Sequence, residues 1–106
     1  MNRQQLQQII SDAFEVSWNE IISKKRNVNL VFARNIYCFH RYYGNAISTE
    51  VVGSDINRDH ATVLHGLSSY RRDYQNCEAF KRIADEVEER IKTTTSCHLK
   101  RSNATD

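Results

Sequence analysis

Two helical patterns in the middle of the chain are joined by the sequence Gly53-Ser54-Asp55-Ile56-Asn57-Arg58-Asp59-His60-Ala61-Thr62-Val63. Two helices that cross closely need a small residue in the first helix, and Gly53 is such a residue. Asn57, four residues later, tolerates the positive φ of a tight turn, and Val63 supplies the buried branched side chain that follows. This spacing predicts a helix-turn-helix, although an ordinary antiparallel helix hairpin has the same three residues.

The rest of the chain also has helical periodicity, since apolar residues recur three and four positions apart. We expect an all-α fold of five to six helices around the helix-turn-helix. The first expected helix is Asn2 to Phe14, and a short second one is capped by Ser17. The third is Val28 to Tyr43, with Phe32, Ile36, Phe39 and Tyr43 facing inward, and a short fourth one is capped by Ser48 or Thr49, with Val51 and Val52 facing inward. The fifth is Arg58 to Asp73, and the sixth is capped by Asn76 and continues to Ile91. Gly44 is the expected stop of the third.

Composition is consistent with a single helical domain. The 106 residues contain no proline, three glycines and a net charge of only +2, so charge alone indicates little about partners. We expect residues 1–93 to form the domain and 94–106 to be a disordered polar tail. The start of the chain has no signal peptide or membrane-span pattern, and its three cysteines have no metal-ligand spacing. A cytoplasmic, nucleoid-associated protein with reduced thiols is expected.

A longer motif then points to a family. The run Arg58-Asp59-His60-Ala61-Thr62-Val63-Leu64-His65-Gly66 resembles the signature at the start of the recognition helix of the bacterial replication initiator DnaA. Similar matches are Ser23 to Arg26 with the family's basic loop, Ala33 to Ile36 with the start of its long helix, and Ser48 to Gly53 with its first motif helix. The resemblance extends from Ile9 to Ile91 and implies the Trp-repressor-like fold of that family's C-terminal DNA-binding domain.

The resemblance also implies roles in DNA recognition. Asp59, His60 and Ala61 match residues that read base edges in the major groove, where a carboxylate accepts from cytosine, an imidazole donates to an acceptor and a methyl contacts thymine. Arg26 matches an arginine that enters the minor groove. The expected contacts to the DNA backbone are Lys24, Lys25, Arg34, Asn35, Ser48, Thr49, Arg58 and Thr62. We expect replacement of Asp59 or His60 to weaken specificity and to leave folding intact.

Three positions depart from the family pattern. Asn57 stands where two glycines are usual, Ala61 where threonine is usual, and Tyr42 where a basic residue is frequent. These departures concern the exact target sequence more than the binding role.

Catalysis is not expected. The three glycines, at positions 44, 53 and 66, do not form a GxxxxGK[ST] phosphate loop, and no nucleophile–base set or zinc site emerges from the spacing of the histidines and cysteines. We therefore expect no enzymatic activity, cofactor or metal. The leading hypothesis is sequence-specific binding to double-stranded DNA, at sites like those of the initiator, in control of replication initiation or transcription. The alternative is a protein-interaction module that contacts a replication initiator or a replisome component.

Two further residues have structural interpretations. His40 lies beside the apolar stripe of the third helix and is expected at the edge of the core. Gly66 lies inside a helix, where glycine is less favourable than alanine by roughly 1 kcal/mol, so we expect a close approach to its backbone.

Overall fold

Helices connected by short loops make up the structure, a computed structural model that describes the backbone of residues 2–102 and the side chains of residues 2–94. In chain order the elements are α1 (Arg3–Phe14), α2 (Trp18–Ile21), α3 (Val28–Phe39), the π-helix η1 (His40–Gly44), α4 (Thr49–Asp55), α5 (His60–Asn76) and α6 (Glu78–Ser102). These residues include no strand. The predicted all-α fold is confirmed.

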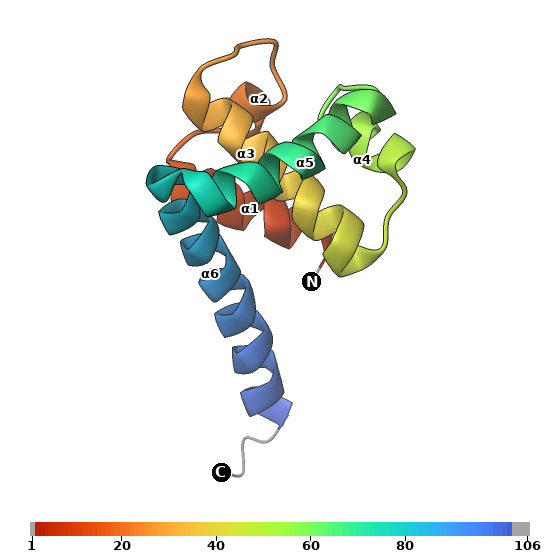
Figure 1. The fold of residues 1–106 in the computed structure, drawn as a ribbon. Coiled ribbons are helices and arrows are strands. Elements are labelled where there is room, and N and C mark those ends of the chain that lie inside the picture. Colours follow the sequence, from red (N-terminus) through yellow and green to blue (C-terminus); the bar gives the residue numbers. More distant parts are fainter. Residues whose placement is uncertain (1, 103–106) are drawn as a thin grey trace.

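Helix α3 occupies the centre of the domain, and α1 and α5 pack against it (Figure 1). Helix α6 packs against α1 and α5 near its start and then extends away from the domain. Side chains from all six α-helices meet in one core, in which the fully buried members include Leu6, Ile10, Ile21, Leu30, Ile36, Tyr37, Val52, Val63, Phe80 and Val87. This core fixes α4 and α5, the two helices of the motif, on the long helix α3.

Polar caps explain where five of the helices begin. Asn2, Ser17, Asn27, Ser48 and Asp59 each accept a hydrogen bond from a backbone N–H in the first turn of α1, α2, α3, α4 and α5. Such caps satisfy donors that have no partner within the helix. At Asn2 the bond is reciprocal, since the Gln5 side chain accepts from the Asn2 N–H to complete a capping box. The caps predicted at Ser17 and Ser48 are confirmed.

The third predicted helix changes its geometry part of the way along. Gly44 is not the helix stop that the sequence predicts: it is the last residue of η1, Asn45 is the C-cap, and the left-handed φ that a glycine stop would have falls on Ala46. Residues from His40 onward form the π-helix η1. A π-turn holds one residue more than an α-turn, so it rotates the following side chains relative to an α-helical stripe. Tyr43, which is predicted to face inward, is 50% exposed, whereas Arg41 is buried. The expectation for Tyr43 is therefore wrong because it assumes α-helical spacing throughout.

Three further expectations about the helices need correction. Val51 is predicted to face inward but is 49% exposed, because α4 turns Val52 and Gly53 to the core. Asn76 does not cap α6; it lies in the last turn of α5, where its side-chain amide donates to the Arg72 carbonyl. Helix α5 begins at His60 rather than Arg58, because Asp59 is its N-cap.

The predicted tail coincides with the last part of α6. The helical backbone of α6 continues to Ser102, past Thr93, after which an irregular tail is expected. The side chains beyond residue 94 and residues 103–106 lie outside the described part. The domain boundary at residue 93 stays a prediction.

Two cysteines lie in the described part, and both are free thiols. Cys38 is buried, and burial raises the pKa of its thiol to about 12. A thiol with so high a pKa is a packing group and a poor nucleophile. No helix among the described residues is both long and apolar enough to cross a bilayer.

His40 lies at the edge of the core, as predicted, in contact with the aromatic rings of Phe39 and Tyr70. Its Nε2 is buried without a hydrogen-bond partner among the described residues. Burial lowers the pKa of His40, and Glu88 opposes the effect only in part. The folded protein therefore binds fewer protons than the unfolded chain just below the ordinary histidine pKa of about 6.5.

We expect the unfolding free energy to fall as the pH is lowered through about 6.5, because His40 is protonated in the unfolded chain at a pH at which it stays neutral in the folded protein. Urea unfolding of wild type and His40→Phe between pH 7.5 and pH 5.5 measures this loss. The variant should lose much of the slope, and His65→Ala, which removes an exposed histidine, should retain it. Equal slopes in wild type and His40→Phe would contradict the assignment to His40.

Candidate nucleic-acid interface

Helix α4 packs so closely against the turn before α5 that there is no room for a side chain at Gly53. A Cβ atom at Gly53 would overlap the carbonyl oxygen of Arg58, and the Arg58 N–H donates to the Gly53 carbonyl at 2.8 Å. Asn57 has φ of 58°, and Val63 is fully buried. All three residues thus have the roles that the spacing predicts, and the close crossing favours a helix-turn-helix over a simple hairpin.

The first turn of α5 presents polar side chains to solvent. Asp59 caps the helix by accepting the Thr62 N–H at 2.9 Å, and this hydrogen bond lowers the pKa of the Asp59 carboxyl. His60, Ala61 and Thr62 are exposed beside it. One oxygen of Asp59 is committed to the cap. The expectation that Asp59 has no part in folding is corrected by this cap.

We expect Asp59→Ala to lower the melting temperature by about 4 to 8 °C, the range typical for loss of an N-cap in a domain of this size. Asp59→Asn should lose far less, because the asparagine side chain caps a helix equally well. Thermal unfolding of the three proteins at pH 7 measures the difference. Equal melting temperatures for Asp59→Ala and wild type would show that the cap contributes nothing.

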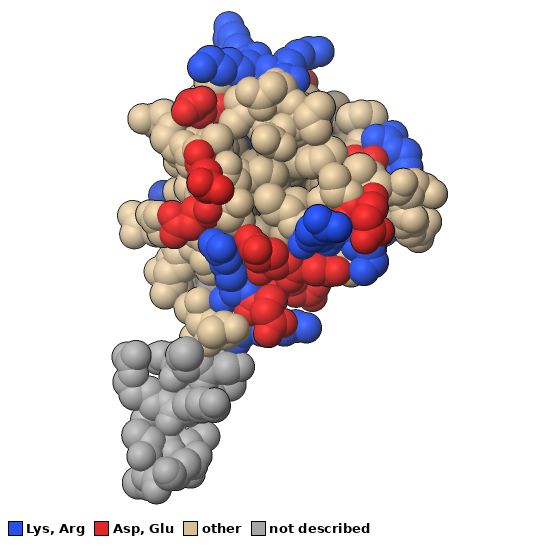
Figure 2. Space-filling view, turned by 90° about the vertical axis from the view of Figure 1, so that its left-hand side faces the viewer, with Lys and Arg blue, Asp and Glu red and all other residues tan. Residues whose placement is uncertain are grey.

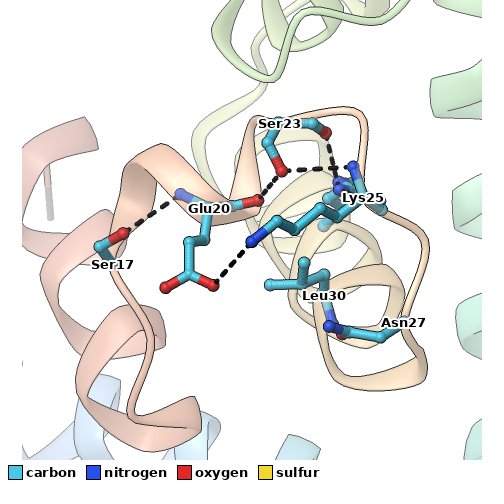
Figure 3. A network of polar contacts seen from close by, with 7 residues as sticks. Ser17, Glu20, Ser23, Lys25, Asn27 and Leu30 are labelled. Carbon is cyan, nitrogen blue, oxygen red and sulfur yellow. Dashed lines mark hydrogen bonds and ion pairs between the residues drawn. The ribbon is translucent and has the colours of Figure 1, made fainter.

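The loop between α2 and α3 carries the basic run Lys24-Lys25-Arg26 and is held by several short contacts (Figure 3). The Ser23 hydroxyl donates to the Glu20 carbonyl and accepts from the Lys25 N–H, and the Lys25 ammonium lies 3.8 Å from the Glu20 carboxylate. The loop therefore has a defined backbone conformation.

The basic side chains of this loop gather at one end of the molecule (Figure 2). Lys24, Lys25 and Arg26 are all exposed. Lys24 and Arg26 have no ion-pair partner within the described part of the chain. Unpaired cations on a fixed loop are suited to contact a polyanion.

Arg34 has a structural role in the fold. Its side chain is buried, its Nε donates to the Ile21 carbonyl at 2.5 Å, and its Nη2 donates to the carbonyls of Ser23 at 2.8 Å and Lys25 at 2.6 Å. A guanidinium with these partners is a structural brace of the loop. The sequence did not predict this structural role, and the contact of Arg34 with the DNA backbone stays a prediction. Its pKa is lowered by burial and by the nearby positive charges of Arg58 and Arg26.

A groove of about 670 Å³ lies between the basic loop, α3 and α5. Seven of the predicted DNA-contacting residues line it: Arg26, Arg34, Asn35, Arg58, Asp59, Ala61 and Thr62. The other five, Lys24, Lys25, Ser48, Thr49 and His60, lie outside its lining. Among these, Ser48 caps α4 by accepting from the Val51 N–H, and it is exposed at the start of that helix.

Asn35 belongs to the floor of this groove. It is nearly buried, and its side-chain oxygen lies against Gly66, where an added Cβ would be 2.7 Å away. The close approach expected at Gly66 is thus made by α3. Contact of Asn35 with DNA stays a prediction, as do the other predicted DNA contacts.

Two features of the groove are missing from the sequence-based site. Arg72 lines it from the second half of α5, where it pairs with Asp73. The Ser23 carbonyl accepts hydrogen bonds from both Arg34 and Arg58. Helical spacing places Arg72 three turns beyond Ala61 and so gives a weak signal for it, but no sequence pattern indicates a shared carbonyl acceptor.

The tight turn, the exposed start of α5 and the adjacent basic loop define a helix-turn-helix domain, the class in which the second helix enters the major groove of DNA. Within this class, a family model described as "Bacterial dnaA protein helix-turn-helix" matches residues 3–69. The chain belongs to that family.

Several relatives are named chromosomal replication initiator protein DnaA. The protein of Treponema denticola is 32% identical over 92 residues, covering 86% of this chain and 20% of its own length. Those of Lachnoclostridium phytofermentans and Acholeplasma laidlawii are 30% and 31% identical, covering 82% and 85% of this chain. The chain spans about a fifth of the length of these relatives.

Proposed function

We propose that this chain binds double-stranded DNA sequence-specifically, at sites like those of the replication initiator, and acts in control of replication initiation or transcription. The observation that carries the proposal is the exposed first turn of α5, with Asp59, His60 and Ala61 free of the core, directly after a helix-turn-helix turn. A recognition helix reads bases through its N-terminal residues in this way.

The basic loop supports a second contact to the same DNA. Arg26, from the loop, and Asp59 and Ala61, from the start of α5, line the same groove, so a DNA strand seated there would contact both segments. We assign Arg26 to the minor groove next to the major groove that α5 enters. Lys24 and Lys25, with the hydroxyls of Ser48, Thr49 and Thr62, are assigned to phosphates. Binding to chromosomal sites also places the protein on the nucleoid.

Titration of the purified protein against an initiator-box duplex and a scrambled duplex of equal length, at several salt concentrations, tests the proposal. We expect tighter binding to the box, and a slope of log K against log salt of roughly −4 to −5, because about four to six counterions leave the phosphates. Equal, weak binding to both duplexes would contradict sequence recognition and favour the alternative, a protein-interaction module for the replication machinery.

A further inference from the structure

Two arginines from separate parts of the fold converge on one backbone carbonyl of the basic loop. The Ser23 carbonyl accepts from Arg34 Nη2 at 2.8 Å and from Arg58 Nη2 at 2.7 Å. Arg34 comes from α3, whereas Arg58 immediately precedes Asp59, the cap of α5. The loop is thus bonded directly to the turn that starts the recognition helix.

Each arginine also makes hydrogen bonds to other backbone carbonyls. Arg58 Nη1 donates to the carbonyls of Ile56 and Asn57, both at 3.1 Å, so its side chain folds back on the helix-turn-helix turn. Arg34 bonds the loop at Ile21 and Lys25, on either side of Ser23. A planar guanidinium with several donors spans such sets of carbonyls, which a lysine ammonium does not.

The proximity of the two guanidinium groups costs energy. Arg34 has a lowered pKa because it is desolvated and lies near the charges of Arg58 and Arg26. Two like charges at a single carbonyl are stable only because other carbonyls complete their hydrogen bonding. A hydrogen bond from a neutral side chain to Ser23 would avoid this repulsion. The two arginine side chains therefore have two effects: they add positive charge to the groove, and they fix the conformation of the loop.

We propose that Arg34 and Arg58 are positioning residues that clamp the basic loop at a fixed distance from the first turn of α5, so that Arg26 and the residues Asp59 and His60 read one continuous DNA site in a fixed register. This inference rests on the proposed function for its DNA part. The clamp itself is a property of the free protein and is tested without DNA.

Limited proteolysis with trypsin tests the clamp, because trypsin cleaves after Lys24, Lys25 and Arg26, which are exposed on the loop. We expect Arg58→Ala to accelerate cleavage in this loop about tenfold, as for loss of one charge-assisted hydrogen bond. Arg72→Ala is the matched control, since Arg72 lines the same groove but pairs with Asp73 rather than the loop. It should leave loop cleavage unchanged.

Cleavage after Lys81 and Arg82 in α6 reports global unfolding in the same experiment, and the rate of loop cleavage in each variant is divided by its rate. If Arg58→Ala is too unstable to purify, Arg58→Lys serves in its place, because it retains the charge and loses the fork of donors. Loop cleavage that is no faster in the Arg58 variant than in Arg72→Ala would overturn the clamp.

A double-mutant cycle on DNA tests the register. Wild type, Arg26→Ala, Arg58→Ala and the double variant are titrated against box duplexes with an A·T-rich or a G·C-rich flank. We expect wild type to prefer the A·T flank, because a narrow minor groove attracts arginine. Arg58→Ala should lose most of this preference, and Arg26→Ala should then have little further effect. Equal effects of Arg26→Ala with and without Arg58 would overturn the register.

The two experiments separate the failure of this inference from that of the proposed function. If wild type does not distinguish a box from a scrambled duplex, the proposed function and the register both fail, whereas the proteolysis still decides the clamp. If wild type binds the box specifically and the loop cleavage does not respond to Arg58, only the clamp and the register are wrong.

Discussion

Asp55→Ala is expected to lower the unfolding free energy by about 3 to 5 kcal/mol, the cost of removing one partner from a buried ion pair. The Asp55 side chain is 6% exposed at the end of α4. Tyr37 donates its hydroxyl to Asp55 Oδ2 at 2.7 Å, and the Arg41 guanidinium, itself nearly buried, lies 3.7 Å from the same oxygen. The substitution leaves Arg41 buried without a counter-charge.

Urea unfolding at pH 7 measures this effect, and two variants separate its causes. Arg3→Ala removes the exposed partner of the same carboxylate, 3.2 Å away, and should cost less than about 1 kcal/mol, as surface pairs do. Asp55→Asn retains an acceptor for Tyr37 but not the charge, so its loss should lie between the other two. If Asp55→Ala lowers the unfolding free energy no more than Arg3→Ala does, Asp55 does not join α4 to α3 and η1.

Gly53→Ala is expected to lower the unfolding free energy by about 2 to 3 kcal/mol, the upper range for overpacking. The added Cβ overlaps the carbonyl oxygen of Arg58 and closely approaches the carbonyl carbon of Asp59, which are backbone atoms and cannot rotate away. Helices α4 and α5 must therefore move apart. We expect the same variant to lose most of its specific DNA binding, because the displaced α5 no longer enters the major groove of the DNA at its proper angle.

The other two glycines are matched controls for this substitution. Gly44→Ala meets nothing within 4 Å and should be neutral or slightly stabilising. Gly66→Ala meets the side-chain oxygen of Asn35, which is able to shift, so its cost should be intermediate. Thermal unfolding of the three variants gives their order. A Gly53→Ala protein as stable as Gly44→Ala would contradict the close crossing of α4 and α5.

The helix-turn-helix was predictable because its constraints are local. Gly53, Asn57 and Val63 are selected by close packing, positive φ and burial within eleven residues, and each has its predicted environment. Ser17 and Ser48 as caps follow from equally local chemistry. Periodicity over longer segments was sufficient for the all-α class.

The π-helix and the buried arginines were not predictable in the same way. Apolar periodicity assumes a constant number of residues per turn, so it misplaces Tyr43 once η1 begins. Periodicity also treats Arg34 and Arg41 as surface residues, whereas backbone carbonyls of the basic loop and the Asp55 carboxylate make their burial possible. Those partners are separated by 9 to 14 positions in the chain and come together only in the folded structure.

For the candidate site, the sequence predicted which segments lie at the surface better than it predicted the role of each residue. The exposed residues His60 and Ala61 and the basic loop lie on the surface where the motif predicts them. Arg34 and Arg58 lie in the same groove but are bonded to carbonyls, a distinction that residue type alone does not reveal. Asp59 is the cap of α5, a role that the motif does not indicate, and its base contact stays a prediction.

Base reading by the first turn of α5 is tested most directly by a competition assay of wild type and His60→Ala on an initiator-box duplex and a random duplex. His60→Ala is expected to reduce the ratio of box to random affinity about tenfold or more, because one base-directed hydrogen bond is lost and phosphate contacts remain. His65→Ala, which removes an exposed histidine farther along the same helix, should retain the wild-type ratio. A wild-type ratio in His60→Ala, with an unchanged melting temperature, would contradict recognition by this turn.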